Sequence, residues 1–144
     1  MMCGDVMTKD PACCVPTDSV ARVAKVMKTQ DVGSIPVCER QNSRKLVGII
    51  TDRDLALHVV AEGRDANSTN VQDVMTREPF TCHPDEDLQS ALNAMQLYQV
   101  RRIPIVDRMR SWKSASCFRR KRFSAMRTTR EQKDNRMMVS NSVF

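Results

Sequence analysis

The chain repeats itself, and the second copy breaks off. Residues 5–39 align without a gap onto residues 73–107, with 11 identities in 35 positions at a constant offset of 68. The first copy continues into RQNSRKLVGIITDRDLALHVV, whereas the second continues into RMRSWKSASCFRRKRFSAM, which resembles nothing earlier in the chain. A tandem repeat predicts two similar units that pack against each other. The break after residue 107 raises the question of whether the protein has two equivalent sites or one.

Charge separates the repeated part from the rest of the chain. Residues 1–107 hold 12 Lys/Arg and 15 Asp/Glu, a net charge of −3, whereas residues 108–144 hold 11 and 2, a net charge of +9. The repeated part therefore lacks the basic surface of a nucleic-acid-binding domain. No apolar run reaches the roughly 18 residues of a membrane span, and no secretion signal opens the sequence. We expect a cytoplasmic protein that does not bind membranes.

Neither the cysteines nor the histidines predict a reactive site. The six cysteines form no Cys-x-x-Cys pair, and His58 and His83 are isolated. Cys13 and Cys14 have apolar neighbours, so we expect reduced, buried or partly buried thiols rather than a redox or zinc site. The sequence holds no Ser/His/Asp set, metal motif or P-loop. It therefore predicts a protein that is not an enzyme and requires no cofactor.

Each copy predicts the same order of elements. A short strand-like piece, residues 12–15 or 80–83, is followed by helix-start residues and then by apolar residues at the i, i+3, i+4, i+7 spacing of an amphipathic helix. These apolar residues are Val20, Val23, Ala24 and Met27 in the first copy and Leu88, Ala91, Leu92 and Met95 in the second. A proline-containing strand follows each helix.

Only the first copy continues recognisably. Residues 46–50 are an unbroken apolar strand, and a second helix is expected from residue 51 or 52 to about residue 61. Such a strand is typically buried on both faces, so helices must cover a small sheet. The fold class is therefore α+β, with β-α-β-β-α repeats. The corresponding strand of the second copy, expected near residue 114, and its closing helix are not recognisable.

These observations divide the chain into four parts. They are a first repeat at 1–63, a linker at 64–72, the N-terminal part of a second repeat at 73–107 and a basic tail at 108–144.

The order of DVMT, helix, GSIPV and LVGIITDRDL resembles a CBS domain, and the two copies resemble a CBS pair, or Bateman module. The resemblance covers residues 5–61 and 73–107. It implies two repeats related by a pseudo-twofold axis, with an adenosine-containing ligand such as AMP, ATP, S-adenosylmethionine or NAD bound between them as a regulator. It also implies that the pair forms a homodimer.

The segment GIITDRD, residues 48–54, is similar to the ribose-phosphate signature of that family. Thr51 lies where a strand turns into a helix, so free backbone N–H groups and the helix dipole favour a phosphate there. Asp54, three residues on, has two acceptor oxygens that suit the two hydroxyls of a ribose. The same spacing is that of a capping box, which satisfies the N–H groups of a helix start and binds nothing. Both roles stay open.

The resemblance implies that residues of the other repeat complete this site. The predicted partners of Thr51 and Asp54 are Thr76, Thr81, Val100, Arg101, Ile103 and Pro104. Backbone groups near Val100 would meet the adenine, Ile103 would supply an apolar surface, and Arg101 or Arg102 could face the phosphate. The alternatives are a solvated surface for the arginines and core packing for Ile103 and Pro104.

The resemblance also implies a symmetry-related site. It would use Thr8, Cys13, Val32 and Gly33, together with an aspartate at position 122. Arg122 occupies that position, so the second site lacks its ribose-binding residue and we do not expect a nucleotide there.

Two hypotheses account for the tail. In the first, the coding sequence carries a frameshift: one codon choice for residues 109–117, read one base earlier, yields a Val-Gly-Ile stretch. In the second, residues 119–122 (RRKR), with Trp112, Phe118 and Phe123 nearby, form a genuine and largely disordered basic arm that binds nucleic acid or an anionic membrane.

The sequence is compatible with three functions. The leading one is a non-catalytic sensor of an adenine nucleotide, which acts by shifting the population of two repeat arrangements. The second is a dimerising scaffold that binds no nucleotide. The third is nucleic-acid binding through the tail.

Overall fold

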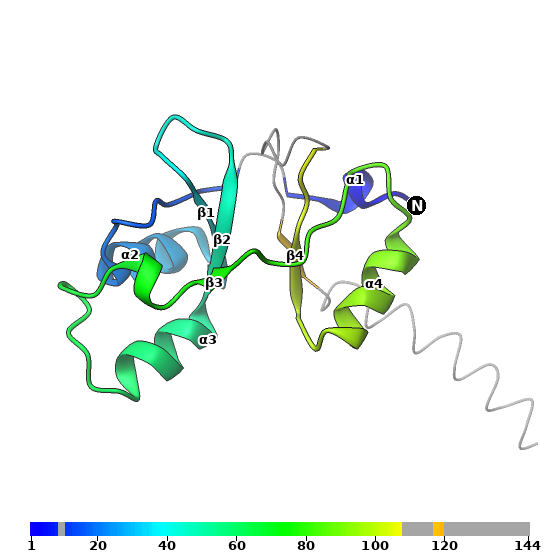
Figure 1. The fold of residues 1–144 in the computed structure, drawn as a ribbon. Coiled ribbons are helices and arrows are strands. Elements are labelled where there is room, and N and C mark those ends of the chain that lie inside the picture. Colours follow the sequence, from blue (N-terminus) through cyan, green and yellow to red (C-terminus); the bar gives the residue numbers. More distant parts are fainter. Residues whose placement is uncertain (9–10, 108–116, 120–144) are drawn as a thin grey trace, which may run out of the picture.

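The computed structural model describes residues 1–8, 11–107 and 117–119, with only the backbone described for the last three. Both hypotheses about the tail concern residues that lie mostly outside these ranges. The described elements form two units that lie side by side (Figure 1).

The first unit is built around helix α2 (Val20–Gln30). Ser19 caps its N-terminus by accepting a hydrogen bond from the Arg22 N–H at 3.3 Å. The helix ends at Asp31, whose φ of 51° is left-handed. The expected stripe is confirmed for its buried members Val20, Val23 and Met27. Ala24 is exposed because it lies at the edge of that stripe, so its assignment to the buried face was wrong.

Two antiparallel strands follow α2. They are β1 (Ser34–Cys38), which is buried throughout, and β2 (Leu46–Thr51). Helix α3 (Asp52–Leu55) begins directly after β2 and continues as a π-helical turn, η1 (Ala56–Val60). The second helix of the first repeat therefore lies where the sequence predicts it, and Thr51 marks the change from strand to helix.

The second unit reproduces the same helix and strand. Helix α4 (Leu88–Leu97) is capped by Asp87, which accepts from the Gln89 N–H at 3.0 Å. Three members of its stripe are buried: Leu88, Ala91 and Met95. Strand β4 (Arg102–Pro104) occupies the position that β1 has in the first unit.

The second repeat has a further strand that the sequence analysis missed. Strand β5 (Cys117–Arg119) pairs antiparallel with β4, with Ile103 opposite Phe118. The expectation that this strand is absent was therefore wrong. Strand pairing depends on backbone hydrogen bonds, so it does not require the apolar sequence of the first copy.

The strand-like pieces at 12–15 and 80–83 form single parallel bridges rather than strands. Cys14 pairs with Val37 in the first unit, and Cys82 pairs with Ile105 in the second. Prolines lie close on both sides of each piece, and a proline has no N–H to donate to a strand ladder. The pairing therefore stays short.

The segment that opens each copy packs on the other unit. The 3₁₀ turn η2 (Val71–Asp73) places Val71 in the core of the first unit, and β3 (Thr76–Arg77) extends that sheet to the order β1-β2-β3. Helix α1 (Cys3–Val6) does the reverse, because the Cys3 N–H donates to the Glu86 carbonyl at 2.9 Å and Cys3 lies in the second core. The units are therefore interlocked, and the boundaries at 63 and 73 do not separate them in space.

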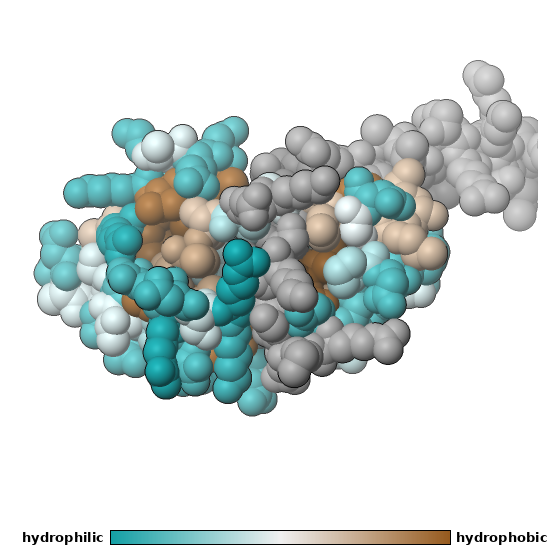
Figure 2. Space-filling view, turned by 90° about the horizontal axis from the view of Figure 1, so that it is seen from above, coloured by the Kyte–Doolittle hydropathy of each residue, from teal (hydrophilic) through white to brown (hydrophobic). Residues whose placement is uncertain are grey.

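Each unit has its own apolar core. The first is formed by α2, β1, β2 and η2, and the second by α1, α4 and β4. Figure 2 shows hydrophilic residues over much of the described surface, with hydrophobic residues reaching that face on both units. No helix in the described ranges is both long and apolar enough to cross a membrane.

Candidate functional site

Thr51 and Asp54 form a reciprocal capping box at the end of β2. The Asp54 N–H donates to Thr51 Oγ1 at 3.2 Å, and the Thr51 N–H donates to Asp54 Oδ2 at 2.9 Å. Thr51 Oγ1 also donates to Oδ2 at 3.0 Å. Every one of these bonds to the carboxylate uses Oδ2. Oδ1 has no hydrogen-bond partner among the residues that the structure describes, so the cap leaves one acceptor oxygen available for a ligand.

Glycine 48 lets the second copy approach this strand. A β-carbon on Gly48 would lie 2.7 Å from the carbonyl oxygen of Thr76, closer than real β-carbons approach a backbone atom. Gly48 and Ile49 pair with Arg77 and Thr76 of β3. The structure therefore brings Thr76 to the strand that ends in Thr51, although Thr76 itself is exposed.

Arg102 connects the second unit to the first. Its Nη1 donates to the Gly33 carbonyl at 2.5 Å and lies 3.3 Å from Oδ1 of Asp52. The same carbonyl accepts the Asp52 N–H at 3.0 Å. Asp52 directly follows Thr51 in the sequence. The Arg102 guanidinium therefore contacts the neighbour of a capping-box residue.

Gly33 makes this contact possible. A β-carbon at position 33 would overlap Nη2 of Arg102 and would lie 2.6 Å from Oδ2 of Asp52. The guanidinium therefore packs directly on the Gly33 backbone. A larger residue at position 33 would require the Arg102 side chain to shift from this position.

The other predicted site residues lie on the second unit with different exposures. Arg101 is exposed, and Thr81 and Val100 are half-buried. Ile103 and Pro104 are buried, and Ile103 is part of the second core. This burial agrees with the alternative role of Ile103 and Pro104 as core residues. A contact between Ile103 and a ligand stays a prediction.

The structure describes several members of the symmetry-related set. Gly33 lies against Arg102, Val32 is exposed, and Cys13 lines a hollow beside α2. Position 122 is outside the described residues, so the expected loss of the second site stays a prediction.

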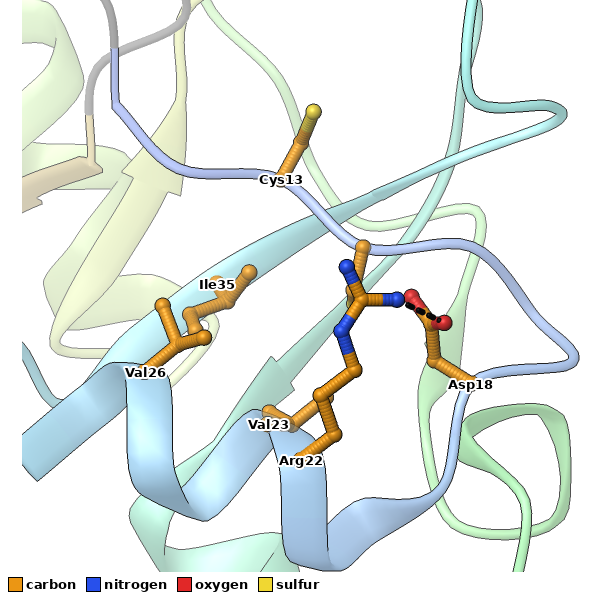
Figure 3. A pocket seen from close by; sticks show the side chains of 7 residues that line it. Cys13, Asp18, Arg22, Val23, Val26 and Ile35 are labelled. Atoms are coloured by element: carbon orange, nitrogen blue, oxygen red, sulfur yellow. Dashed lines mark hydrogen bonds and ion pairs between the residues drawn. The ribbon is translucent and has the colours of Figure 1, made fainter.

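A small hollow lies beside α2 (Figure 3). It encloses about 20 Å³, space for roughly one water molecule, so it is too small for a nucleotide. The Asp18–Arg22 ion pair closes one side. The residues that line it are Cys13, Cys14, Asp18, Arg22, Val23, Val26 and Ile35.

The expectation of buried or partly buried thiols is confirmed for four cysteines and is wrong for Cys13, whose side chain is exposed. The buried ones are Cys3, Cys14, Cys38 and Cys82, and none of these five described cysteines forms a disulfide bond. Burial, with Asp18 nearby, raises the pKa of Cys14 to about 12. Burial also raises the pKa of Cys82 to about 12, with the Glu86 charge adding to the effect. A thiol that stays protonated is a poor nucleophile and a poor metal ligand. No group of three or more His, Cys, Asp or Glu in the described ranges could hold a metal ion.

The contact of Arg102 with Gly33 and Asp52 is the part of this site that the sequence left undecided. The sequence analysis placed Arg101 in the predicted site and offered either Arg101 or Arg102 for a phosphate. The alignment does not separate the two, because the first copy has a different residue at both positions, Gly33 and Ser34.

Comparison with known proteins places this geometry in a family. The model of the CBS domain matches residues 3–61 and again 71–110. The CBS domain-containing protein YhcV of Bacillus subtilis is 41% identical over 103 residues, which are 72% of this chain and 71% of that protein.

Two solved structures have the same arrangement of units. The CBS domain pair of protein MJ0100, in complex with 5′-methylthioadenosine and S-adenosyl-L-methionine, superimposes with a TM-score of 0.76 at 25% identity, over 88% of this chain and 98% of that one. The CBS domain protein PAE2072 from Pyrobaculum aerophilum, complexed with AMP, gives a TM-score of 0.72 at 18% identity, over 78% and 84% of the two chains. On two family matches that cover more than half of its length, the chain belongs to the CBS domain family and carries a tandem α+β CBS pair.

Proposed function

We propose that the protein is a regulatory module that binds an adenosine-containing ligand at Thr51 and Asp54, between its two repeats. The observation that carries the proposal is Oδ1 of half-buried Asp54, which has no hydrogen-bond partner within the described ranges because the cap uses only Oδ2. A carboxylate oxygen held in this way is a ready acceptor for a ribose hydroxyl.

The placement of the second copy supports the proposal. Thr76 comes beside β2, and Arg102 reaches across to Gly33 and Asp52. A ligand at Asp54 would therefore contact groups from both repeats. The CBS pair of MJ0100 binds two adenosine derivatives, 5′-methylthioadenosine and S-adenosylmethionine, which supports the class of ligand.

The regulatory effect would follow from linkage. A ligand that contacts both repeats favours the arrangement in which its contacts are made, and it shifts the population by no more than its difference in affinity for the two arrangements. No chemical step is needed. The module would act on a partner through that shift.

The test is ligand binding by titration calorimetry and by thermal unfolding, with adenosine, AMP, ATP, S-adenosylmethionine and NAD in turn. A ligand present at 100 times its Kd should stabilise the folded state by about 2.7 kcal/mol. Asp54→Ala should abolish both the heat of binding and the thermal shift. If none of these compounds binds the unmodified protein, the proposal is wrong.

A matched control separates ligand binding from capping. Asp73 forms an equivalent capping box with Asn70, whose N–H donates to Asp73 Oδ2 at 3.3 Å, at the start of η2. Asp73→Ala should cost stability comparable to the loss of the Asp54 cap, about 1 kcal/mol, and leave binding intact. Loss of binding in both variants would mean that Asp54 acts only through stability.

A second function, self-association, is supported by exposed apolar side chains on helical segments of the first and second units. Val60 of η1 is 77% exposed and Leu97 of α4 is 75% exposed. Covering either side chain with a second copy would remove apolar surface from water and so stabilise a dimer. We expect a homodimer in sedimentation that Val60→Asp weakens, with or without ligand. A monomeric unmodified protein would contradict this function.

A further inference from the structure

The cysteines whose side chains the structure describes differ in their access to solvent. Cys13 is exposed, whereas the other four are buried. Figure 3 shows the Cys13 sulfur directed away from the hollow beside α2 and from the side chains that line it. A small oxidant dissolved in water therefore reaches Cys13 before it reaches the buried thiols, because the reactivity of a thiol follows its exposure.

The backbone places Cys13 beside Cys38. Cys14 forms a parallel bridge with Val37. The Cys14 N–H donates to the Pro36 carbonyl at 3.1 Å, and the Cys14 carbonyl accepts the Cys38 N–H at 2.8 Å. Cys13 and Cys38 each lie one residue from this bridge. Because successive side chains of an extended segment point to opposite faces, Cys13 and Cys38 share the face that Cys14 does not use.

The thiols of Cys13 and Cys38 are in hydrogen-bond contact with each other. Burial raises the pKa of Cys38 to about 12, and the charge and hydrogen bond of Cys13 add to the effect. Cys38 therefore keeps its proton and does not react first with an oxidant. It lies beside the Cys13 sulfur once that sulfur has reacted. A disulfide joins two sulfur atoms at about 2.0 Å, so the two have only a short distance left to close.

The thiol pair belongs to the first copy alone. At the aligned positions the second copy has Thr81 and Val106, which cannot form a disulfide. Cys38, Leu46 and Val106 form a small buried cluster that joins the two units. A bridge from Cys13 to Cys38 would therefore act at a contact between the repeats.

From these contacts we infer that Cys13 is a modification site for a low-molecular-weight disulfide of the glutathione class, and that Cys38 resolves the adduct into a Cys13–Cys38 disulfide. The Cys13 thiolate attacks one sulfur of the small disulfide, whose S–S bond breaks and releases one thiolate. Cys38 then loses its proton to water and attacks the Cys13 sulfur, which releases the second thiolate. Two protein thiols are oxidised, and the small disulfide is reduced to two thiols.

This inference goes beyond the proposed function and needs no nucleoside. It also departs from the expectation that the cysteines have no redox role. That expectation rested on spacing, and the distance between Cys13 and Cys38 in the sequence fits no Cys-x-x-Cys motif. Only the pairing of distant segments brings the two thiols together.

The experiment treats the folded full chain with oxidised glutathione and follows the reaction by mass spectrometry. We expect a transient glutathione adduct and then a product that has lost two hydrogen atoms and carries no glutathione. Proteolysis should yield the peptide of Cys13 linked to the peptide of Cys38. The linked protein should unfold at a temperature several degrees higher than the reduced protein, because the bridge closes a loop of the unfolded chain. Dithiothreitol should reverse both changes.

Three variants assign the two roles. Each is made in a Cys117→Ser background, so that the five described cysteines are the only thiols. Cys38→Ser should stop the reaction at a glutathione adduct on Cys13. Cys13→Ser should leave the native protein without adduct or bridge. Cys14→Ala is the matched control, because it removes the buried thiol next to Cys13 and should still form the bridge.

The contrary outcomes are equally specific. A bridge that forms in Cys13→Ser, or one that fails to form in Cys14→Ala, would assign the reaction to Cys14 and overturn the inference. A wild-type protein that does not react, or that keeps its adduct without closing the bridge, would overturn it as well. None of these results involves a nucleoside, so this inference and the proposed function fail separately.

Discussion

The two repeats share their cores and differ at their sites. Ile35 and Ile103 are both 1% exposed, and each helix is followed within two residues by a left-handed residue, Asp31 after α2 and Gln99 after α4. The copies are identical at only 11 of the 35 aligned positions, and one of the differences, Gly33-Ser34 against Arg101-Arg102, lies where one unit receives the guanidinium of the other. The cores accept such differences, because Val20 and Leu88 are both buried at matching positions.

The largest expected effects on stability are in the two apolar cores, which test whether the matching positions Ile35 and Ile103 are equivalent. Ile35→Ala and Ile103→Ala should each lower the free energy of unfolding by about 2–5 kcal/mol, because each removes a buried side chain from a packed cluster. Urea unfolding followed by circular dichroism measures both. A small cost for Ile103→Ala alone would show that the second core is loosely packed.

Two glycines at contacts between the units, Gly48 and Gly33, give a second test of the comparison. Gly48→Ala should cost about 1–3 kcal/mol because the new β-carbon meets the Thr76 backbone, which cannot move without opening the sheet. Gly33→Ala should cost less, since it meets the end of the flexible Arg102 side chain. Equal costs would indicate that Arg102 is held as rigidly as the backbone.

The sequence predicted what depends on local pattern. The helical stripes, the second helix after Thr51 and the Thr51–Asp54 spacing follow from periodicity and from helix-start chemistry, and the structure contains them. The shared helix and strand of the second unit follow from repetition alone.

What the sequence did not predict depends on contacts between distant residues. The opening segments exchange units because Val71 and Cys3 find their apolar partners across the molecule, and no periodicity within a repeat encodes that choice. Strand β5 was missed because its pairing uses the backbone. The Arg102 contact with Gly33 spans 69 positions, so no local pattern pointed to it.

The N-terminal caps of α2 and α4 test whether matching positions of the two copies contribute equally to stability. Ser19 and Asp87 occupy the same position in the repeat and each accepts an N–H at the start of its helix. Replacing either by alanine should cost about 1 kcal/mol, and the carboxylate of Asp87 should contribute more because it also interacts with the helix dipole. Thermal unfolding at two salt concentrations measures both effects, since added salt should reduce the advantage of Asp87 and leave Ser19 unchanged.

The smallest effect near neutral pH concerns a matched pair of thiols. Cys14 and Cys82 occupy matching positions in the two copies and are both buried. Cys13 is exposed, and the second copy has a threonine, Thr81, at the aligned position. In the native protein, iodoacetamide should therefore modify Cys13 well before either buried thiol.

The pH dependence of stability follows from the same burial. The pKa of both Cys14 and Cys82 is about 12 in the folded protein, whereas it is near its ordinary value of 9.0 in the unfolded chain. Folding therefore keeps a proton that the unfolded chain releases above pH 9, so the free energy of unfolding should fall as the pH rises from 9 toward 12 and should not change on this account below 9. Cys14→Ala and Cys82→Ala should each reduce that slope, which urea unfolding at a series of pH values measures. A slope that neither variant reduces would contradict the raised pKa of these two thiols in the folded protein.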